Sequence, residues 1–191
     1  AVFLNDLVRG TADAGMIEEK LQEYNVDILH AQKWLTVLIH IEADTTERPN
    51  ALQKELVPIS VRQIAEDHLR DYCRFTIFNS SAGITLIVAI DENNSQTGLL
   101  DHLGDICKEC RRVLEVTVTI AVGHSCQKLS ELSRVYQSAV DALGYRSIVG
   151  VGQTIYINDV EPVSRGKLKF DNADENDFVT AVKSGNSTPC E

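Results

Sequence analysis

Two cysteines three residues apart form the clearest chemical motif in the sequence. Cys107 and Cys110 make a single C-x-x-C, a spacing found in zinc sites and in redox-active pairs. A zinc site needs further Cys or His ligands at suitable spacing, and the sequence offers no second pair. A redox pair works at a helix N-terminus, where the dipole lowers the thiol pKa. These cysteines fall inside the apolar pattern of a predicted helix, so we interpret both as packing residues.

The histidine and glycine spacings match none of the common catalytic or phosphate-binding motifs. Neither H-E-x-x-H nor H-x-x-x-H occurs, and G-x-S-x-G and G-x-x-x-x-G-K-[ST] are absent from the sequence. Gly150-Val151-Gly152 precedes a predicted strand, whereas a phosphate loop precedes a helix. The five histidines are His30, His40, His68, His102 and His124. From the residues alone we predict no catalytic residue, no metal ligand and no cofactor, and cofactor-binding residues stay unknown.

The elements that would position a site are clearest between residues 116 and 157. Residues 116–122 alternate Val or Ile with Thr or Ala, which predicts a strand with one buried face. Gly123 punctuates it, and Ser130 is a plausible N-cap for the helix that follows. The helix carries an apolar stripe at helical spacing, composed of Leu129, Leu132, Tyr136, Ala139, Val140 and Leu143. Residues 154–157 then predict a second strand.

The earlier part of the chain predicts helices and strands in alternation. A helical preface is expected at 3–8 and 16–24, and the nearly unbroken apolar run at 34–41 predicts a central strand. The pattern at 52–72 predicts a long helix that contains Pro58, where the helix kinks or a second helix starts. Residues 75–78 and 84–90 predict a β-hairpin, followed by a polar turn and a helix at 99–114.

Composition limits the classes of function. The 191 residues are 43% hydrophobic, which is enough for a globular core. The net charge of −10 argues against unaided binding to nucleic acid or to an anionic membrane. No apolar run approaches the roughly 20 residues of a membrane-spanning helix, and no signal peptide is apparent. Five scattered cysteines suit a reducing cytoplasm. We read the chain as a fragment of a longer protein.

The order of these elements predicts an α+β fold. Helices that separate strands on both sides of a central hairpin are typical of a ferredoxin-like layer of helices on a mostly antiparallel sheet. We divide the chain into a helical preface at 1–30, an α/β domain at 31–160 and a linker at 161–191.

Three stretches of the sequence resemble the GGDEF-like domain of bacterial transcription regulators. Residues 3–41, which begin F-L-N-D-L-V-R-G, resemble the start of that module in YesN-type response regulators. Residues 118–146, V-T-I-A-V-G through L-S-E-L-S-R-V-Y-Q-S-A-V-D-A-L-G-Y-R, resemble its last strand-helix unit and are the most specific match. Residues 170–185 resemble the start of the linker before a DNA-binding part. The resemblance spans nearly the whole chain.

The resemblance implies a phosphorylatable receiver domain before this module and an AraC-type helix-turn-helix pair after it. Neither flanking domain is in the sequence, and no residue here is expected to accept phosphate or to contact DNA. The implied partners are a second copy of the chain and the receiver and helix-turn-helix domains of the same protein. Nucleic acid and membrane are not expected partners of this fragment.

The predicted hairpin turn decides what the resemblance implies about chemistry. Active diguanylate cyclases carry Gly-Gly-Asp-Glu-Phe there, where glycines admit the nucleotide and carboxylates bind metal. The matching residues are Asn79, Ser80, Ser81, Ala82 and Gly83, which keep one glycine and no acid. Glu42 and Asp44 match the region of another cyclase metal ligand, but we interpret them as solvated loop carboxylates. We therefore read the signature as degenerate and expect no enzyme activity.

These observations predict a non-catalytic regulatory and dimerisation module of a cytoplasmic two-component response regulator that controls transcription. Phosphorylation of the receiver would change how two modules pack, and the linker would pass that change to the DNA-binding domains. The alternative is a small-ligand sensor of the sugar-diacid type of transcription regulator. A nucleotide cyclase is the least favoured, because the acids that its chemistry needs are missing.

Overall fold

The apolar run near residue 34 forms the central strand of the computed structural model, which describes residues 2–43 and 51–162, with side chains in the second range from residue 55. This strand, β1 (Lys33–Ile41), is buried over most of its length because neighbouring strands and helices cover both of its faces. The other strands are β2 (Arg74–Ser80), β3 (Gly83–Ile90), β4 (Val118–Cys126) and β5 (Thr154–Tyr156).

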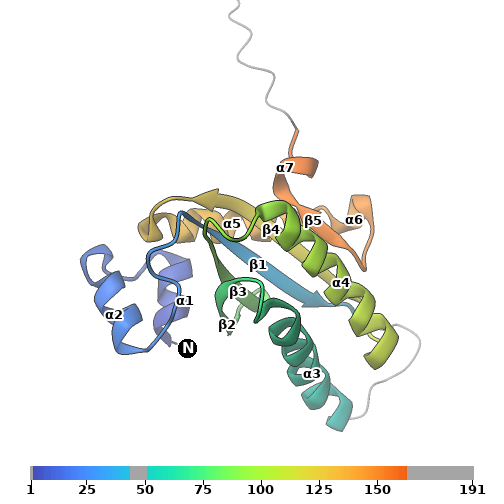
Figure 1. Ribbon diagram of the computed structural model, residues 1–191. Helices are drawn as coiled ribbons and strands as arrows, with labels where there is room; N and C mark the ends of the chain where they lie inside the picture. Colours follow the sequence, from blue (N-terminus) through green and yellow to red (C-terminus); the bar gives the residue numbers. More distant parts are fainter. Residues whose placement is uncertain (1, 44–50, 163–191) are drawn as a thin grey trace, which may run out of the picture. The chain divides into compact units, whose positions relative to one another are not determined.

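The five strands form one sheet in the order β2-β3-β1-β4-β5 (Figure 1). The pairs β2–β3, β3–β1 and β1–β4 are antiparallel, and only β4–β5 is parallel. A register shift between Leu35 and Val37 places Gly123 and His124 of β4 opposite Thr36, which is the two-to-one arrangement of a β-bulge. The predicted α+β fold with a mostly antiparallel sheet is confirmed.

Helices of different lengths connect and follow these strands. They are α1 (Val2–Arg9), η1 (Ala14–Met16), α2 (Ile17–Glu23), α3 (Ala51–Leu69), α4 (Gln96–Leu114), η2 (Leu129–Glu131), α5 (Leu132–Gly144), α6 (Arg146–Val149) and α7 (Ile157–Val160). Among the described helices, none combines the length and the apolar character that crossing a bilayer requires.

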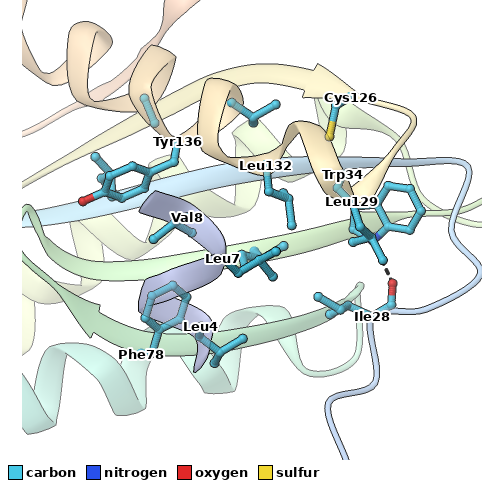
Figure 2. Close-up of a cluster of buried hydrophobic side chains, with 14 of the residues drawn as sticks. Leu4, Leu7, Val8, Ile28, Trp34, Phe78, Cys126, Leu129, Leu132 and Tyr136 are labelled. Carbon is cyan, nitrogen blue, oxygen red and sulfur yellow. Dashed lines mark hydrogen bonds between the residues drawn. The ribbon is translucent and has the colours of Figure 1, made fainter. Parts of the chain in front are cut away.

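Each face of the sheet has its own hydrophobic cluster. On one face, α3 and α4 contribute Val61, Ala65, Leu99 and Leu103 to a cluster with alternate residues of the strands. On the other, α1 and α5 pack over the alternate set, with buried side chains that Figure 2 displays. This second cluster includes Leu4, Leu7, Val8, Ile28, Trp34, Phe78, Leu129, Leu132 and Tyr136. The alternation within β1 follows from the two-residue period of a strand.

The helical preface shares its core with the sheet. Leu4, Leu7 and Val8 of α1 are buried in the same cluster as Leu132 of α5. The 30-residue boundary and the division into preface, domain and linker stay predictions. The predicted linker from residue 163 onward lies outside the described residues.

Most predicted elements are confirmed, and the differences concern α3, the N-cap before α5 and the end of β4. Pro58 lies inside the single helix α3, so no second helix starts there. The predicted N-cap at Ser130 is wrong, because Ser130 lies within η2 and neither η2 nor α5 has a side-chain N-cap bond. The start of α4 has such a bond, from Gly98 N to the Ser95 hydroxyl at 3.0 Å.

The sequence pattern predicted that the strand ends at Gly123. Gly123 instead lies within β4, under α5. A Cβ atom at this position would lie 2.4 Å from the Val135 carbonyl oxygen and 2.9 Å from the Ala139 amide nitrogen. Both neighbours are helix backbone, which cannot rotate aside as a side chain can. Only glycine therefore permits the observed distance between α5 and β4.

We expect Gly123→Ala to lower the free energy of unfolding by about 1–3 kcal/mol, the usual range for overpacking. Urea denaturation of the purified chain measures it. Gly104→Ala is the control, because an added Cβ at Gly104 of α4 meets nothing within 4 Å. Alanine favours helix by up to about 1 kcal/mol over glycine, so the control should be neutral or stabilising. An unchanged unfolding midpoint in Gly123→Ala would contradict the close approach.

Candidate functional site

The predicted signature residues occupy the tip of the β2–β3 hairpin. Asn79 and Ser80 end β2, Ser81 and Ala82 form the turn, and Gly83 begins β3. Gly83 has φ +124°, and a Cβ there would lie 3.0 Å from the Ile39 carbonyl oxygen. The single glycine of the turn is therefore required by backbone conformation and by its approach to β1.

An open pocket of about 340 Å³ lies beside this hairpin. Its lining comes from β1, from α3 and from the hairpin: Ile39, His40, Ile41, Pro58, Asn79, Ser80, Gly83 and Ile84. Ile39, Ile41, Pro58 and Ile84 are the aliphatic residues of this lining, and His40, Asn79 and Ser80 are the polar ones. Its volume is at the low end of the range for small-molecule sites, and those sites are more enclosed. The predicted signature residues thus border a cavity, although no carboxylate lines it among the described residues.

Glu42, at the end of β1, is not a solvated loop carboxylate, and that interpretation is wrong. Its side chain is 18% exposed, and its Oε1 accepts a hydrogen bond from the Thr119 hydroxyl at 2.6 Å. Arg146 Nε lies 3.9 Å from the same oxygen, and His40 Nε2 lies 3.8 Å from Oε2. Glu42 therefore ties β1 to β4 and α6. Asp44, its predicted neighbour in the site, lies outside the described residues.

Thr119 extends this tie toward β5. Its fully buried hydroxyl donates to Glu42 and accepts from the Gly152 amide at 3.0 Å. The loop that precedes β5 is thereby fixed to the start of β4. No group of three His, Cys, Asp or Glu side chains in the part of the chain that the structure describes could hold a metal ion. The hydrogen bond between Thr119 and Glu42 is therefore structural, and it joins β4 to the end of β1.

The histidines contact different parts of the fold. His40 lies beside Glu42, and His124 Nε2 lies 3.2 Å from Glu161 Oε2 at the end of α7. The ring of His102 packs against Tyr72 with 4.4 Å between centroids. Each of these three histidines therefore has a partner of its own, at a separate place in the fold.

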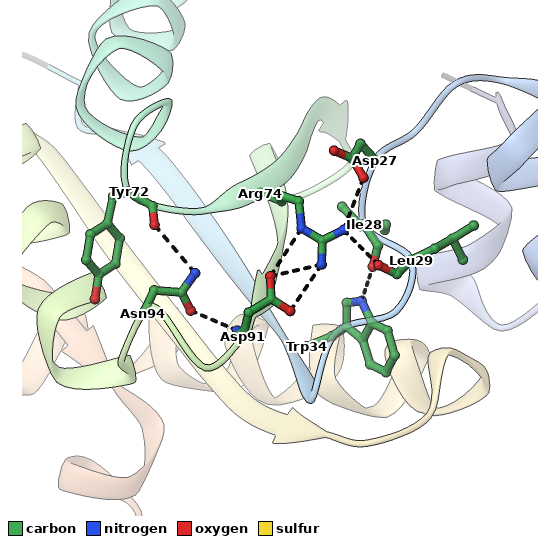
Figure 3. Close-up of polar contacts among 8 residues, drawn as sticks. All are labelled: Asp27, Ile28, Leu29, Trp34, Tyr72, Arg74, Asp91 and Asn94. Carbon is green, nitrogen blue, oxygen red and sulfur yellow. Dashed lines mark hydrogen bonds and ion pairs between the residues drawn. The ribbon is translucent and has the colours of Figure 1, made fainter.

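A polar cluster surrounds Arg74 (Figure 3), and the sequence pattern did not predict it. Its guanidinium donates to both oxygens of Asp91 at 2.9–3.1 Å, to Asp27 at 3.1 Å and to the Leu29 carbonyl at 2.7 Å. The hydrogen bond with Asp91 raises the pKa of Arg74. Trp34 Nε1 donates to the Ile28 carbonyl at 2.7 Å beside this cluster. Together these bonds fix the segment between α2 and β1 to the sheet.

The interpretation of Cys107 and Cys110 as packing residues is confirmed. Both are buried within α4 and belong to the cluster between α4 and the sheet. Burial raises the pKa of Cys110 to about 11 and also raises the pKa of Cys107. Burial raises the pKa of Cys73 to about 12. Protonated thiols of this kind are poor nucleophiles.

Comparison with known proteins gives a family match and a structural match. A family model described as GGDEF-like domain matches residues 9–145. A solved structure described as the active GGEEF domain of a diguanylate cyclase from Vibrio cholerae is similar, with a TM-score of 0.51 and 10% sequence identity. The match covers 73% of this chain and 88% of that chain. No curated protein matches the chain. At this identity the structural likeness shows the fold.

The prediction that the domain is not an enzyme is wrong. The structural match contradicts it, because an active diguanylate cyclase domain has the same fold. The missing acids in one hairpin were too narrow a basis for that conclusion. The reading of residues 79–83 as a degenerate signature stays a prediction. The receiver and AraC-type context also stays a prediction, since neither comparison addresses it.

We expect Glu42→Ala to lower the free energy of unfolding by about 1–2 kcal/mol, because the buried Thr119 hydroxyl loses its acceptor. Chemical denaturation measures the change. Glu92→Ala is the matched control, since Glu92 is exposed in a turn, and should change stability by less than about 0.5 kcal/mol. Equal effects of the two substitutions would show that Glu42 contributes no more than a surface carboxylate.

The buried thiols should react slowly with a disulfide reagent at pH 8 in the native state and rapidly in urea. A rise in the pKa of Cys73 from 9.0 to about 12 lowers its thiolate fraction about a thousandfold at that pH. The measurement uses Cys190→Ser, which leaves only Cys73, Cys107, Cys110 and Cys126. Native protein that reacts as fast as the denatured protein would contradict this burial.

Proposed function

The chain belongs to the GGDEF-like domain family, and on that premise we propose that it acts as a regulatory and self-associating module of a cytoplasmic response regulator that controls transcription. The stretches that resemble YesN-type regulators support this context. Residues 3–41 comprise α1, α2 and β1, and residues 118–146 comprise β4 and α5. The four free cysteines of the described residues support a reducing compartment.

The observation that carries the proposal is the position of α5. This helix packs against α1, near the start of the domain, and against α7, at its end. A rigid helix in contact with both ends is suited to pass a displacement from a preceding domain to a following one. Change in packing at α1 would reach α7 through α5, which is a mechanical route for regulation.

The test uses the full-length product that contains this chain. Val8, 2% exposed in the core that α1 shares with α5, is changed to Ala, and reporter transcription is measured with the receiver phosphorylated and unphosphorylated. The ratio between the two states should fall at least about twofold, because a looser α1 transmits less. Arg9→Ala, on the exposed side of the same helix, is the control. A gene product without receiver and helix-turn-helix domains would refute the proposal.

A second candidate is a small-ligand sensor, favoured by the pocket beside the hairpin. The residues that line it are aliphatic ones of β1, β3 and α3 together with His40, Asn79 and Ser80. This composition suits a small molecule held by apolar contact and oriented by one or two hydrogen bonds.

A thermal-shift screen of the isolated chain with GTP plus Mg²⁺ and with organic acids tests the sensor. A compound that binds should raise the unfolding temperature in proportion to the logarithm of its concentration. The shift should be lost in Asn79→Ala, at the pocket, and kept in Asn93→Ala, at an exposed turn. Chromatography of the GTP samples measures cyclase activity in the same experiment. A screen without any shift would leave the regulatory proposal and remove the sensor.

A further inference from the structure

The hydroxyl group of Ser80 lies where the hairpin meets α5. Its Oγ is 2.8 Å from Thr85 Oγ1, 2.9 Å from Tyr136 Oη and 3.1 Å from the Ala82 amide nitrogen. Thr85 is fully buried and Tyr136 is 8% exposed. Tyr136 projects from α5 in Figure 2 and belongs to the same hydrophobic cluster as Phe78 of the hairpin. The three hydroxyls therefore form a chain between β3, β2 and α5.

Counting protons gives this chain one arrangement in which each contact between hydroxyls is a hydrogen bond. A hydroxyl donates one hydrogen bond and accepts two. In this arrangement Thr85 donates to Ser80, which also accepts from the Ala82 amide and donates to Tyr136. In the reverse direction Tyr136 donates to Ser80, and Ser80 and Thr85 direct their protons toward the Gly83 carbonyl at 3.5 and 3.3 Å, which leaves no proton between the Thr85 and Ser80 oxygens. The two directions differ in whether Tyr136 accepts or donates.

One end of the domain is hydrogen-bonded next to this chain, and the other end contacts the helix that carries Tyr136. Asn5 Nδ2 of α1 donates to the carbonyl of Asn79 at 3.0 Å, one residue before Ser80. On α5, the Ser138 hydroxyl donates to the Val135 carbonyl at 2.7 Å and accepts from the His124 amide at 2.8 Å. The His124 ring lies beside Glu161, at the end of α7.

We infer that the hydroxyl chain Thr85–Ser80–Tyr136 is a conformational coupling between the hairpin tip and both ends of the domain. The chain joins the hairpin to α5, and α5 contacts α1 and α7. The inference concerns contacts within the domain and stands whether or not the proposed regulatory context holds.

Amide hydrogen exchange of the chain, read by NMR, tests the inference with Ser80→Ala. We expect exchange about 2- to 10-fold faster in the hairpin, in α1 and in α7, the factor that corresponds to one lost hydrogen bond. Exchange in α3 and α4, on the other face of the sheet, should not change, whereas general destabilisation would accelerate it too. Ser81→Ala, the exposed neighbour in the turn, is the control. Changes confined to residues 78–86, or spread equally over both faces, would overturn the coupling.

Tyr136→Phe provides the second variant, because it removes only the hydroxyl oxygen and keeps the ring in the core. It should accelerate the same amides as Ser80→Ala, and the double variant should add little to either, since both break one chain. Tyr145→Phe is its control, as the Tyr145 side chain packs on the same cluster. Fully additive effects of Ser80→Ala and Tyr136→Phe would show that the two hydroxyls act independently and would refute the inference.

Discussion

The close contact of α5 with Gly123 is the constraint on which most of the fold depends. Because glycine brings the helix backbone against β4, the side chains of α5 reach across the sheet to β1 and to the hairpin. α1 then packs on α5, and Tyr136 meets Ser80. Protein interiors are packed as densely as organic crystals, so a shift of α5 by the width of a methyl group would disturb these contacts together. The bulge opposite Thr36 occurs at this same point of β4.

The sequence predicted the elements whose signal lies in neighbouring residues. The period of two at 116–122, the apolar run at 34–41 and the helical stripe at 99–114 correspond to β4, β1 and α4, and the α+β fold follows from their order. The interactions that it did not predict join residues far apart in the chain. Arg74 binds Asp27 and Asp91, and Glu42 binds Thr119, 77 residues away. No local period marks such partners.

The candidate site was also predicted only in part from the sequence. The tip of the hairpin was located from composition, and the structure places a pocket beside it. The inference from its missing acids to a missing activity failed, because it treated one turn as the whole of the chemistry. A domain with this fold and 10% sequence identity is an active cyclase domain, so the backbone can be kept while most side chains change. Activity therefore has to be measured on this chain.

The two faces of the sheet differ in a way that bears on regulation. Among the described residues, the buried polar side chains are Thr36, Thr85, Thr119 and Ser138. By strand alternation, and by the position of Ser138 on α5, all of them lie on the face that α1 and α5 cover, while α3 and α4 cover an apolar cluster. Buried hydroxyls stabilise one arrangement only where their bonds are complete, so they specify geometry more strictly than aliphatic contacts do. A shift on this face would also have to break or exchange the hydrogen bonds of Thr85, Thr119 and Ser138, whereas the buried Thr36 hydroxyl has no hydrogen-bond partner among the described residues. Discrete conformational change in this domain is therefore expected on the α5 face, which also contacts both ends.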